Sequence, residues 1–264
     1  MGAMDLRLAG KRALVNAAST GLGYAIAEAL ATEGARVAIC SQDGNAVGAA
    51  ERLAAATGAE VHGFDADVAD LASLEGLFAQ ALPALGGLDV LVNNAGGPPT
   101  GGFVDLDEAA WSRGYHLTMM SVVRAVRLAL PAFEAAGGGR VLTSLSSSVK
   151  TPIPNLLLSN VYRPALVGLI KSLAIEFGPK NVQVLGIAPG RITTDRTRQL
   201  DEAAAARTGK TFEEVRAASV ATIPMGRFGE PKEYGQIAAF LCSPAAAYVN
   251  GSVVLVDGGS IRAL

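Results

Sequence analysis

Residues 11–23 (KRALVNAASTGLG) join a short apolar run to a turn built from small residues. The apolar run, residues 11–16, predicts a buried strand, and the helical spacing of Ile26, Ala29 and Leu30 predicts a helix directly after the turn. The first N–H groups of such a helix have no partner within it, and small residues let a phosphate approach them closely. Taken alone, the turn is compatible both with phosphate binding and with close packing of the helix.

The alternation of strand and helix continues along the chain. Residues 36–41 (RVAICS) predict a second strand after Gly34, a natural helix stop, and residues 47–56 predict the next helix. Further strands are predicted at residues 60–64, 89–93, 140–145, 182–187 and 253–256. Continuous apolar strands that alternate with helices indicate a parallel sheet covered on both faces. The predicted fold class is α/β, with a doubly wound parallel sheet of about seven strands.

The chain is expected to form a single domain over residues 1–264, because no break in composition divides it. Residues 191–224 are rich in Ala, Glu and Arg and interrupt the alternation before the last helix and strand. We interpret residues 191–224 as a helical lid over a substrate site.

Composition excludes several classes of protein. The formal net charge is −2 and the basic residues are scattered, which argues against a nucleic-acid partner. No apolar run approaches the roughly 20 residues of a membrane span, and no signal-peptide core precedes Lys11. Leu6 stands where a myristoylation signal has Ser or Thr, so Gly2 is given no function. Cys40 and Cys242 lie in apolar segments and are interpreted as buried thiols, which favours a cytoplasmic location.

Several further motifs follow the first turn in a fixed order. They are Asp67-Val68, Asn93-Asn94-Ala95-Gly96, Pro189-Gly190 with Ile192 and Thr194, residues 223–231 (IPMGRFGEP), Asn250-Gly251 and residues 256–259 (VDGG). With these motifs the chain resembles the short-chain dehydrogenase/reductase family from about Leu8 to Gly259. The closing stretch is typical of the bacterial branch that resembles oxoacyl-carrier-protein reductases. The resemblance implies a Rossmann-type fold and a small-molecule substrate.

The resemblance also implies a site for a nicotinamide dinucleotide, NAD or NADP. The first turn matches T-G-x-x-x-G-x-G with Asn16 and Ala17 in place of the Thr and the first Gly. The residues expected to bind the dinucleotide are Ala17, Ser19, Thr20, Gly21, Leu22, Gly23, Ser41, Gln42, Asp67, Val68, Asn94, Ala95, Gly96, Arg163, Pro189, Gly190, Ile192 and Thr194.

Each of these motifs also has a structural interpretation. Asp67 could cap the following helix, Asn93 and Asn94 could form a turn after a strand, and Pro189 with Gly190 could simply end one. Their joint order is what favours a dinucleotide site.

The choice between NAD and NADP is left open. An acidic residue at the end of the second strand would bind ribose hydroxyls, and a basic residue nearby would accept a 2′-phosphate. The aligned positions hold Ser41 and Gln42, and the loop position that is often Arg in users of NADP is Thr20. These side chains hydrogen-bond to either form of the ribose.

The catalytic positions depart from the family pattern. The family uses a Ser, a Tyr thirteen residues later, a Lys four residues after that, and an upstream Asn. Here the Ser is kept as Ser146, while Ser159 takes the Tyr position and Arg163 the Lys position. The Asn position, seven residues after Trp111, is Thr118.

These replacements predict impaired proton transfer. Ser159 is a much weaker acid than a phenol, whereas general acid catalysis needs a pKa near the working pH. Arg163 keeps the positive charge and, at the i+4 position from Ser159, shares its helix face, so it could still hold ribose hydroxyls.

Other titratable residues receive structural interpretations. Tyr162 lies about 100° around the helix from Arg163 and is interpreted as a packed or interface tyrosine unless Pro164 distorts that turn. The remaining candidates are interpreted as loop charges in solvent (Lys150, Asp195 and Arg196) or as structural residues without metal-ligand spacing (His62 and His116). No metal site is predicted.

Three functions remain at this point. The first is an oxidoreductase with an atypical site acting on a carbonyl or an alcohol. The second is a non-catalytic dinucleotide-binding protein, and the third is lyase chemistry like that of halohydrin dehalogenases, which also use Arg at the Lys position but keep a Tyr.

A homo-oligomer, a tetramer or a dimer, is expected as well. The family associates through the helix that carries the Ser-x-x-x-Arg pair and through the last helix and strand. That helix offers an apolar stripe for burial, formed by Ala165, Leu166, Leu169, Ile170 and Leu173.

Overall fold

In the part of the chain that the structure describes, seven parallel strands form one sheet in the order β3-β2-β1-β4-β5-β6-β7. The computed structural model describes residues 5–263, so Gly2 lies outside the described residues. The predicted strands are all present, with ends that differ by at most two residues. They are β1 (Arg12–Val15), β2 (Arg36–Ser41), β3 (Val61–Asp65), β4 (Val90–Asn93), β5 (Gly139–Ser144), β6 (Val182–Pro189) and β7 (Val253–Val256). The predicted fold class is therefore confirmed.

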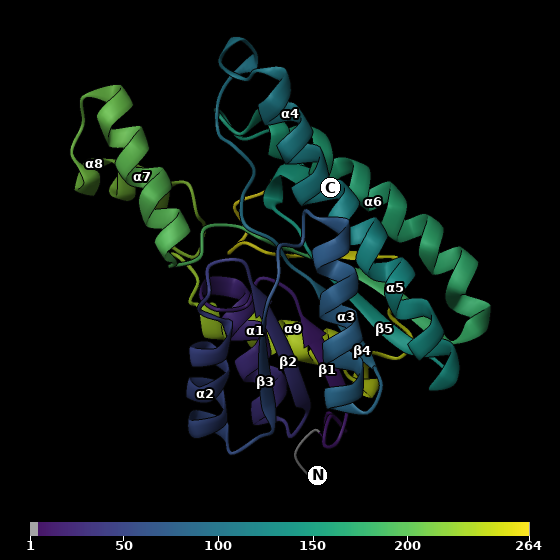
Figure 1. Cartoon of the computed structure of the whole chain (residues 1–264). Coiled ribbons are helices and arrows are strands. Elements are labelled where there is room, and N and C mark those ends of the chain that lie inside the picture. The colour runs from purple at the N-terminus through teal and green to yellow at the C-terminus, as the bar shows by residue number, and fades with distance from the viewer. Residues whose placement is uncertain (1–4, 264) are drawn as a thin grey trace.

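Helices cover both faces of the sheet (Figure 1). One face carries α1 (Gly21–Thr32), α2 (Ala46–Thr57) and α9 (Pro231–Cys242). The other carries α3 (Leu71–Leu85), α5 (Ser121–Ala135) and α6 (Leu157–Phe177), with α4 (Glu108–Tyr115) packed on α6. Two apolar clusters, one on each face, form the core.

The central strands explain where a site can form. Val15 of β1 pairs with Ile39 of β2 on one side and with Val92 of β4 on the other, and all three side chains are fully buried. From this point the strand order runs in opposite directions to the two edges of the sheet. The loops after β1 and β4 therefore diverge at the carboxyl ends of the strands and leave a crevice between them.

The apolar stripe predicted on α6 packs mostly against the sheet of its own chain. Leu166 and Ile170 are each 1% exposed and belong to the core, and Leu169 and Leu173 pack against it. Assigning this stripe to a partner surface was wrong, because helical spacing alone does not say which face meets the sheet. The outward apolar residues of α6 include Val161 and Ile175.

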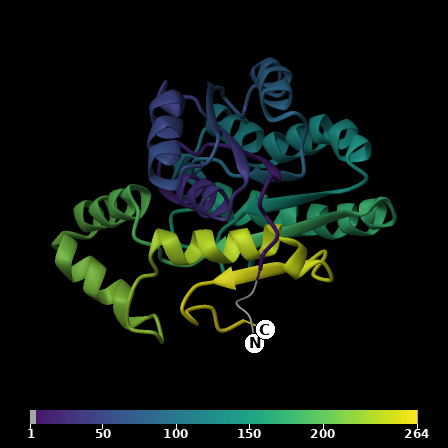
Figure 2. The same ribbon diagram turned by 90° about the horizontal axis from the view of Figure 1, so that it is seen from below.

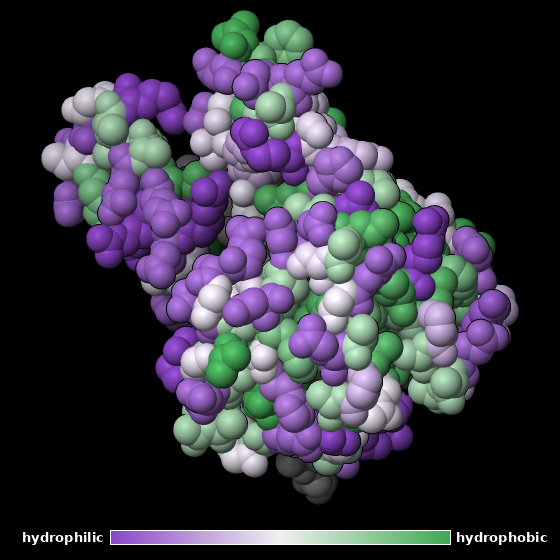
Figure 3. All heavy atoms as spheres, in the orientation of Figure 1, coloured by the Kyte–Doolittle hydropathy of each residue, from purple (hydrophilic) through white to green (hydrophobic). Residues whose placement is uncertain are grey.

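Two polar helices, α7 (Asp195–Thr208) and α8 (Phe212–Ala221), occupy the segment interpreted as a lid. They project from the sheet and its covering helices in both ribbon views (Figures 1 and 2). An ion pair ties α7 to the segment after β6, because Nη1 of the partly exposed Arg191 lies 2.7 Å from Oδ1 of the fully buried Asp201. Figure 3 shows a hollow between this projecting lobe and the rest of the molecule. Within residues 5–263, no helix is both long and apolar enough to cross a membrane.

Candidate functional site

A cleft of about 670 Å³ lies at the carboxyl ends of the strands. Its walls come from the loops after β1, β2, β4, β5 and β6, together with the start of α7. The predicted dinucleotide-binding residues that line it are Ala17, Ser19, Thr20, Gly21, Leu22, Ser41, Gln42, Val68, Asn94, Ala95, Gly96, Arg163, Pro189, Gly190, Ile192 and Thr194. Segments far apart in sequence thus meet in one crevice, where open α/β sheets bind their ligands.

The first turn has the backbone that an approaching phosphate needs. Ala17 and Gly21 both have left-handed backbone, with φ of 48° and 62°. Thr20, the residue before α1, makes no side-chain capping hydrogen bond, so the first N–H groups of α1 stay open toward the cleft. The positive end of the helix dipole adds to their attraction for an anion.

Gly23 does not line the cleft but seats the turn on α1. A Cβ atom there would lie 2.7 Å from Asn94 Nδ2 and 2.9 Å from Ala18 Cα, closer than real contacts allow. The Asn94 amide in turn donates to the carbonyl oxygen of Ala17 at 2.9 Å. The glycine and the asparagine together fix the turn between β1 and α1, and the residues present fit a dinucleotide diphosphate.

Asp43 lines the cleft beside the loop after β2 and was missed by the sequence analysis. Ser41 Oγ donates to Asp43 Oδ1 at 2.6 Å, and Ser19 Oγ reaches Oδ2 at 3.4 Å. Hydrogen bonds from Ser41 and Asn45 lower the pKa of Asp43 to about 2, so its carboxylate stays ionised at neutral pH. The end of β2 therefore does present an acidic group, two positions later than the aligned Ser41.

The Asp67 side chain is hydrogen-bonded to the backbone and is not among the residues that line the cleft. Its Oδ1 accepts from the N–H of Ala69 at 2.8 Å, while Asp70 caps α3 by accepting from the N–H of Ser73 at 2.7 Å. Val68, next in sequence, is 5% exposed and lines the cleft.

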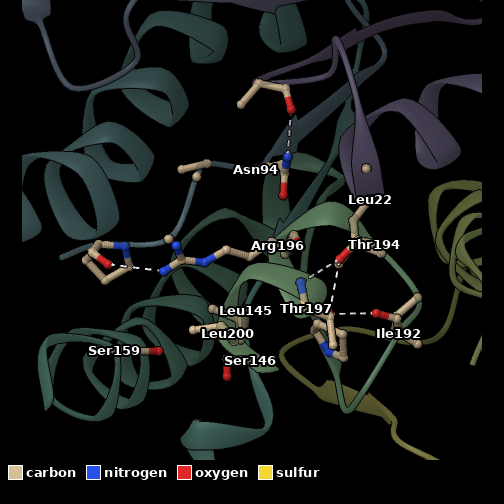
Figure 4. Close-up of a pocket in the computed structure, with 18 of the residues that line it drawn as sticks. Leu22, Asn94, Leu145, Ser146, Ser159, Ile192, Thr194, Arg196, Thr197 and Leu200 are labelled. Carbon is tan, nitrogen blue, oxygen red and sulfur yellow. Dashed lines mark hydrogen bonds between the residues drawn. The ribbon is translucent and has the colours of Figure 1, made fainter. Parts of the chain in front are cut away.

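The segment after β6 is tightly packed. A Cβ atom on Gly190 would lie 2.7 Å from Asp257 Cα, so only glycine fits between the ends of β6 and β7. Thr194 Oγ1 accepts from the N–H of Thr197 at 3.3 Å and caps α7, as the dashed lines in Figure 4 show. Thr197 Oγ1 donates to the carbonyl oxygen of Ile192 at 2.6 Å. These bonds hold Ile192 and Thr194 at the cleft wall.

Ser146 and Ser159 both line the cleft, but their hydroxyls have different surroundings (Figure 4). Ser146 Oγ accepts from the N–H of Ser148 at 3.1 Å, which leaves its own proton to donate. Ser159 is 5% exposed, and its Oγ lies 3.0 Å from Oγ of Ser148. The hydroxyl at the family's Tyr position is therefore engaged with another serine.

Arg163 is a buried cation, 9% exposed, at the floor of the cleft. Its Nη1 donates to the carbonyl oxygen of Ser144 at 3.0 Å. Burial lowers the pKa of Arg163 to about 10, so it remains protonated at neutral pH. Within the described part of the chain, no carboxylate forms an ion pair with it. Its remaining N–H donors are free to bind ribose hydroxyls.

Thr118 lies behind the cleft in a π-helical turn, His116–Met120. It is 4% exposed, and its Oγ1 has no hydrogen-bond partner among the described residues. Together with Asn93, Ser144 and Arg163 it lines a polar cavity of about 10 Å³. That is about the volume that one water molecule needs.

Tyr162 is a packed tyrosine, as interpreted from the sequence. Its hydroxyl donates to the carbonyl oxygen of Trp111 at 3.1 Å, and its ring packs against Trp111 and Tyr115. The helix α6 continues through Pro164 without a break in its assignment. Tyr162 is not among the residues that line the cleft.

Asp195 and Arg196 both line the cleft and are both exposed, so they are charges in contact with solvent as interpreted, but they lie on the first turn of α7 and not in a loop. Arg196 extends across the cleft in Figure 4, and its guanidinium lies over Gly97 and reaches the carbonyl oxygen of Pro98 at 3.5 Å. Sequence spacing gave no sign of this contact, because it joins the start of α7 to the loop after β4. Lys150 is exposed and is not among the lining residues.

Comparisons with known proteins agree with this geometry. Residues 17–260 match the family model described as Enoyl-(Acyl carrier protein) reductase. The human protein Dehydrogenase/reductase SDR family member 4 is 35% identical over 254 residues, which cover 96% of this chain and 88% of that protein. The 7alpha-hydroxysteroid dehydrogenase of Escherichia coli (strain K12) is 32% identical over 98% of each chain.

Solved structures show the same fold with a dinucleotide bound. L-sorbose reductase from Gluconobacter frateurii, complexed with NADPH and L-sorbose, superposes with a TM-score of 0.93 at 30% identity over 99% of this chain and 100% of that one. A 7 alpha-hydroxysteroid dehydrogenase complexed with NADH gives a TM-score of 0.88 at 32% identity over 98% of each chain. The chain belongs to the short-chain dehydrogenase/reductase family.

Proposed function

We propose that this protein binds NAD or NADP in the cleft and acts as an oxidoreductase on a small carbonyl compound or alcohol, with an atypical catalytic site. The observation that carries the proposal is the turn between β1 and α1. Its backbone N–H groups are open, and Gly23 fixes its shape, so it can bind the diphosphate of a dinucleotide. The same cleft is lined by Ser146 and Arg163. The relatives that bind NADPH and NADH support the same assignment.

The residues of the chain then have separable roles. The dinucleotide, when bound, supplies or accepts the hydride. Arg163 holds the ribose through its free N–H donors, and its buried charge orients that sugar. Ser146 donates a hydrogen bond to the substrate oxygen and stabilises charge that develops there. Ser159 cannot supply a proton as a phenol does, so the chemical step is slow on ordinary ketones.

A non-catalytic dinucleotide-binding protein is the second candidate. The observation in its favour is that no tyrosine in the chain is followed four residues later by lysine, while the dinucleotide seat is intact. Lyase chemistry ranks third, because halohydrin dehalogenases remodel the nucleotide turn and the turn here is kept.

A carbonyl panel separates the first two candidates. The purified protein is supplied with NADH or NADPH, and loss of absorbance at the reduced nicotinamide band is followed for ketones, ketoacids and aldehydes. The expected result is slow oxidation of NADH or NADPH that requires the carbonyl compound and that falls when Ser146 is replaced by alanine. Binding of NADH without turnover on any member of the panel would favour the non-catalytic candidate.

We predict that NADH binds more tightly than NADPH because of Asp43. The ionised carboxylate faces the site of the adenosine ribose, where it accepts hydrogen bonds from hydroxyls and repels a 2′-phosphate. Asp43 is exposed and screened by salt, so the expected preference is modest, about five- to tenfold in Kd. Fluorescence titrations of both dinucleotides measure it. Asp43→Asn should bring the ratio of the Kd for NADPH to the Kd for NADH toward one. An unchanged ratio in that variant would refute the role of Asp43.

Residues 191–224 remain a proposed lid, anchored by the pair between Arg191 and Asp201. We also propose a homo-oligomer in the cytoplasm. The outward residues Val161 and Ile175 of α6 and the half-buried edge strand β7 are the surfaces that support association. Light scattering at micromolar protein concentration tests this, and a monodisperse monomer would overturn it.

A further inference from the structure

The guanidinium of Arg196 lies at the cleft and packs against the backbone of Gly97. A Cβ atom on Gly97 would lie 2.6 Å from Arg196 Nη2 and 2.9 Å from Nε, so the guanidinium rests directly on the glycine backbone. Among the described residues, the one acceptor within hydrogen-bond distance of this guanidinium is the carbonyl oxygen of Pro98, 3.5 Å from Nη2. A guanidinium has five N–H donors, and most of them here face the cleft or solvent without a strong acceptor.

Within residues 5–263, Arg196 forms no ion pair. Two carboxylates among the described residues line the same cleft, those of Asp43 and Asp195, and neither forms an ion pair with Arg196. Asp43 accepts from Ser41 and Ser19 beside the loop after β2, and Asp195 is exposed at the first turn of α7, where it complements the helix dipole. Arg196 as a whole is exposed at the mouth of the cleft, and the packing of its guanidinium on the Gly97 backbone lowers its pKa through partial loss of solvent.

Arg163 is a second cation that lines the same cleft. The charge of Arg196 acts together with burial to lower the pKa of Arg163, so the two guanidinium groups repel each other across the cleft. An anion placed between them would relieve that repulsion and satisfy N–H donors of Arg196. Ser159 also lines the cleft, and its side chain is much shorter than the phenol that the family has at this position, which leaves more room for a substrate group.

We propose that the substrate carries a carboxylate that Arg196 binds in a forked, two-bond geometry, so that the substrate class is short oxo acids or the corresponding hydroxy acids. This inference rests on the proposed oxidoreductase function. The apolar side chains of Ile153, Leu156 and Leu200 line the cleft and would pack against the carbon chain of the acid. Arginine is suited to this role, because its planar fork matches a carboxylate.

The test compares charged and uncharged probes of the same shape. Short oxo acids, from pyruvate to 5-oxohexanoate, and the primary amide of each are titrated by calorimetry into protein saturated with NADH. At least one acid is expected to bind more tightly than its amide, by about tenfold or more, which is the size of a charge-assisted hydrogen bond. Arg196→Gln should remove that difference and leave the amide unaffected.

Two further variants sharpen the result. Gly97→Ala keeps the charge but fills the seat of the guanidinium, so it should also weaken the binding of the acid. Arg198→Gln is the matched control, because Arg198 lies on α7, is exposed, pairs with Glu202 and is not among the residues lining the cleft. It should keep the full preference for the acid.

Contrary outcomes are distinct. Equal binding of acids and amides, binding of neither, or a preference that survives Arg196→Gln would overturn the proposal. A loss of NADH affinity in Arg196→Gln as large as the loss of acid affinity would show that Arg196 holds the dinucleotide diphosphate instead. If wild-type protein does not bind NADH at all, the proposed function fails, and the comparison of acid with amide on the free protein still decides whether Arg196 is an anion site.

Discussion

The double substitution Ser159→Tyr with Arg163→Lys is expected to raise the turnover number for carbonyl reduction by about 10² to 10⁴-fold, the usual contribution of a positioned general acid. Ser159 lines the cleft, so a phenol at this position has space to enter it, and a lysine four residues later would place a compact ammonium beside that phenol. The gain should appear in kcat, and single-turnover rates with NADH measure the chemical step directly.

The single substitution Ser159→Tyr is the matched comparison. It should give a smaller gain, because the Arg163 guanidinium is tied to the carbonyl oxygen of Ser144 and is bulkier than an ammonium. Fast carbonyl reduction by the wild type that persists in a variant lacking both the Ser159 and the Arg163 side chains would contradict this account. It would mean that another acid transfers the proton.

Gly23→Val is expected to raise the Kd for NADH by about 100-fold or more. The added side chain would meet Ala18 and Asn94 at distances that require the turn to move, and the diphosphate seat depends on that turn. A loss of about 3 kcal/mol or more corresponds to this factor. Fluorescence titration with NADH measures the affinity.

Gly76→Val is the control for this prediction. Gly76 lies inside α3, and a Cβ atom there would meet no other heavy atom within 4 Å. This variant should keep or slightly raise the stability of the protein, because valine is a better helix former than glycine, and it should bind NADH like the wild type. Circular dichroism of both variants shows whether they fold. Retained affinity in a folded Gly23→Val protein would mean that the turn does not hold the diphosphate.

Much of the fold could be predicted because its strands are buried on both faces. Such strands appear in sequence as short apolar runs, and β2 was predicted with the bounds that the structure shows. The direction in which a helix faces is harder to predict. Leu166 and Ile170 share a stripe with Ala165, and only the packing of α6 on the sheet shows that the first two are core while Ala165 is exposed.

The parts of the site that depend on neighbouring residues in the sequence were predicted, and those that depend on long-range contacts were not. The turn around Gly21 and Gly23 lies within one segment, and its geometry follows from adjacent residues. The role of Arg196 depends on a contact across the cleft with Gly97, far away in sequence. Asp43 lies two residues after the position that the family pattern marks, where the loop after β2 bends back toward Ser19.

The pairing of Ser159 with Ser148 could not be foreseen either. It depends on how the loop after β5 folds against the start of α6, which spacing along the chain does not describe. That pairing strengthens the expectation that Ser159 is a poor proton donor, because its hydroxyl already has a partner.

The most direct test of the central claim is an equilibrium titration of the wild-type protein with NADH, followed by the fluorescence of the bound nicotinamide. The account predicts saturable binding of one NADH per chain, tighter than that of NADPH, in a protein that reduces ordinary ketones slowly. The absence of measurable affinity for either dinucleotide at millimolar concentration would contradict it.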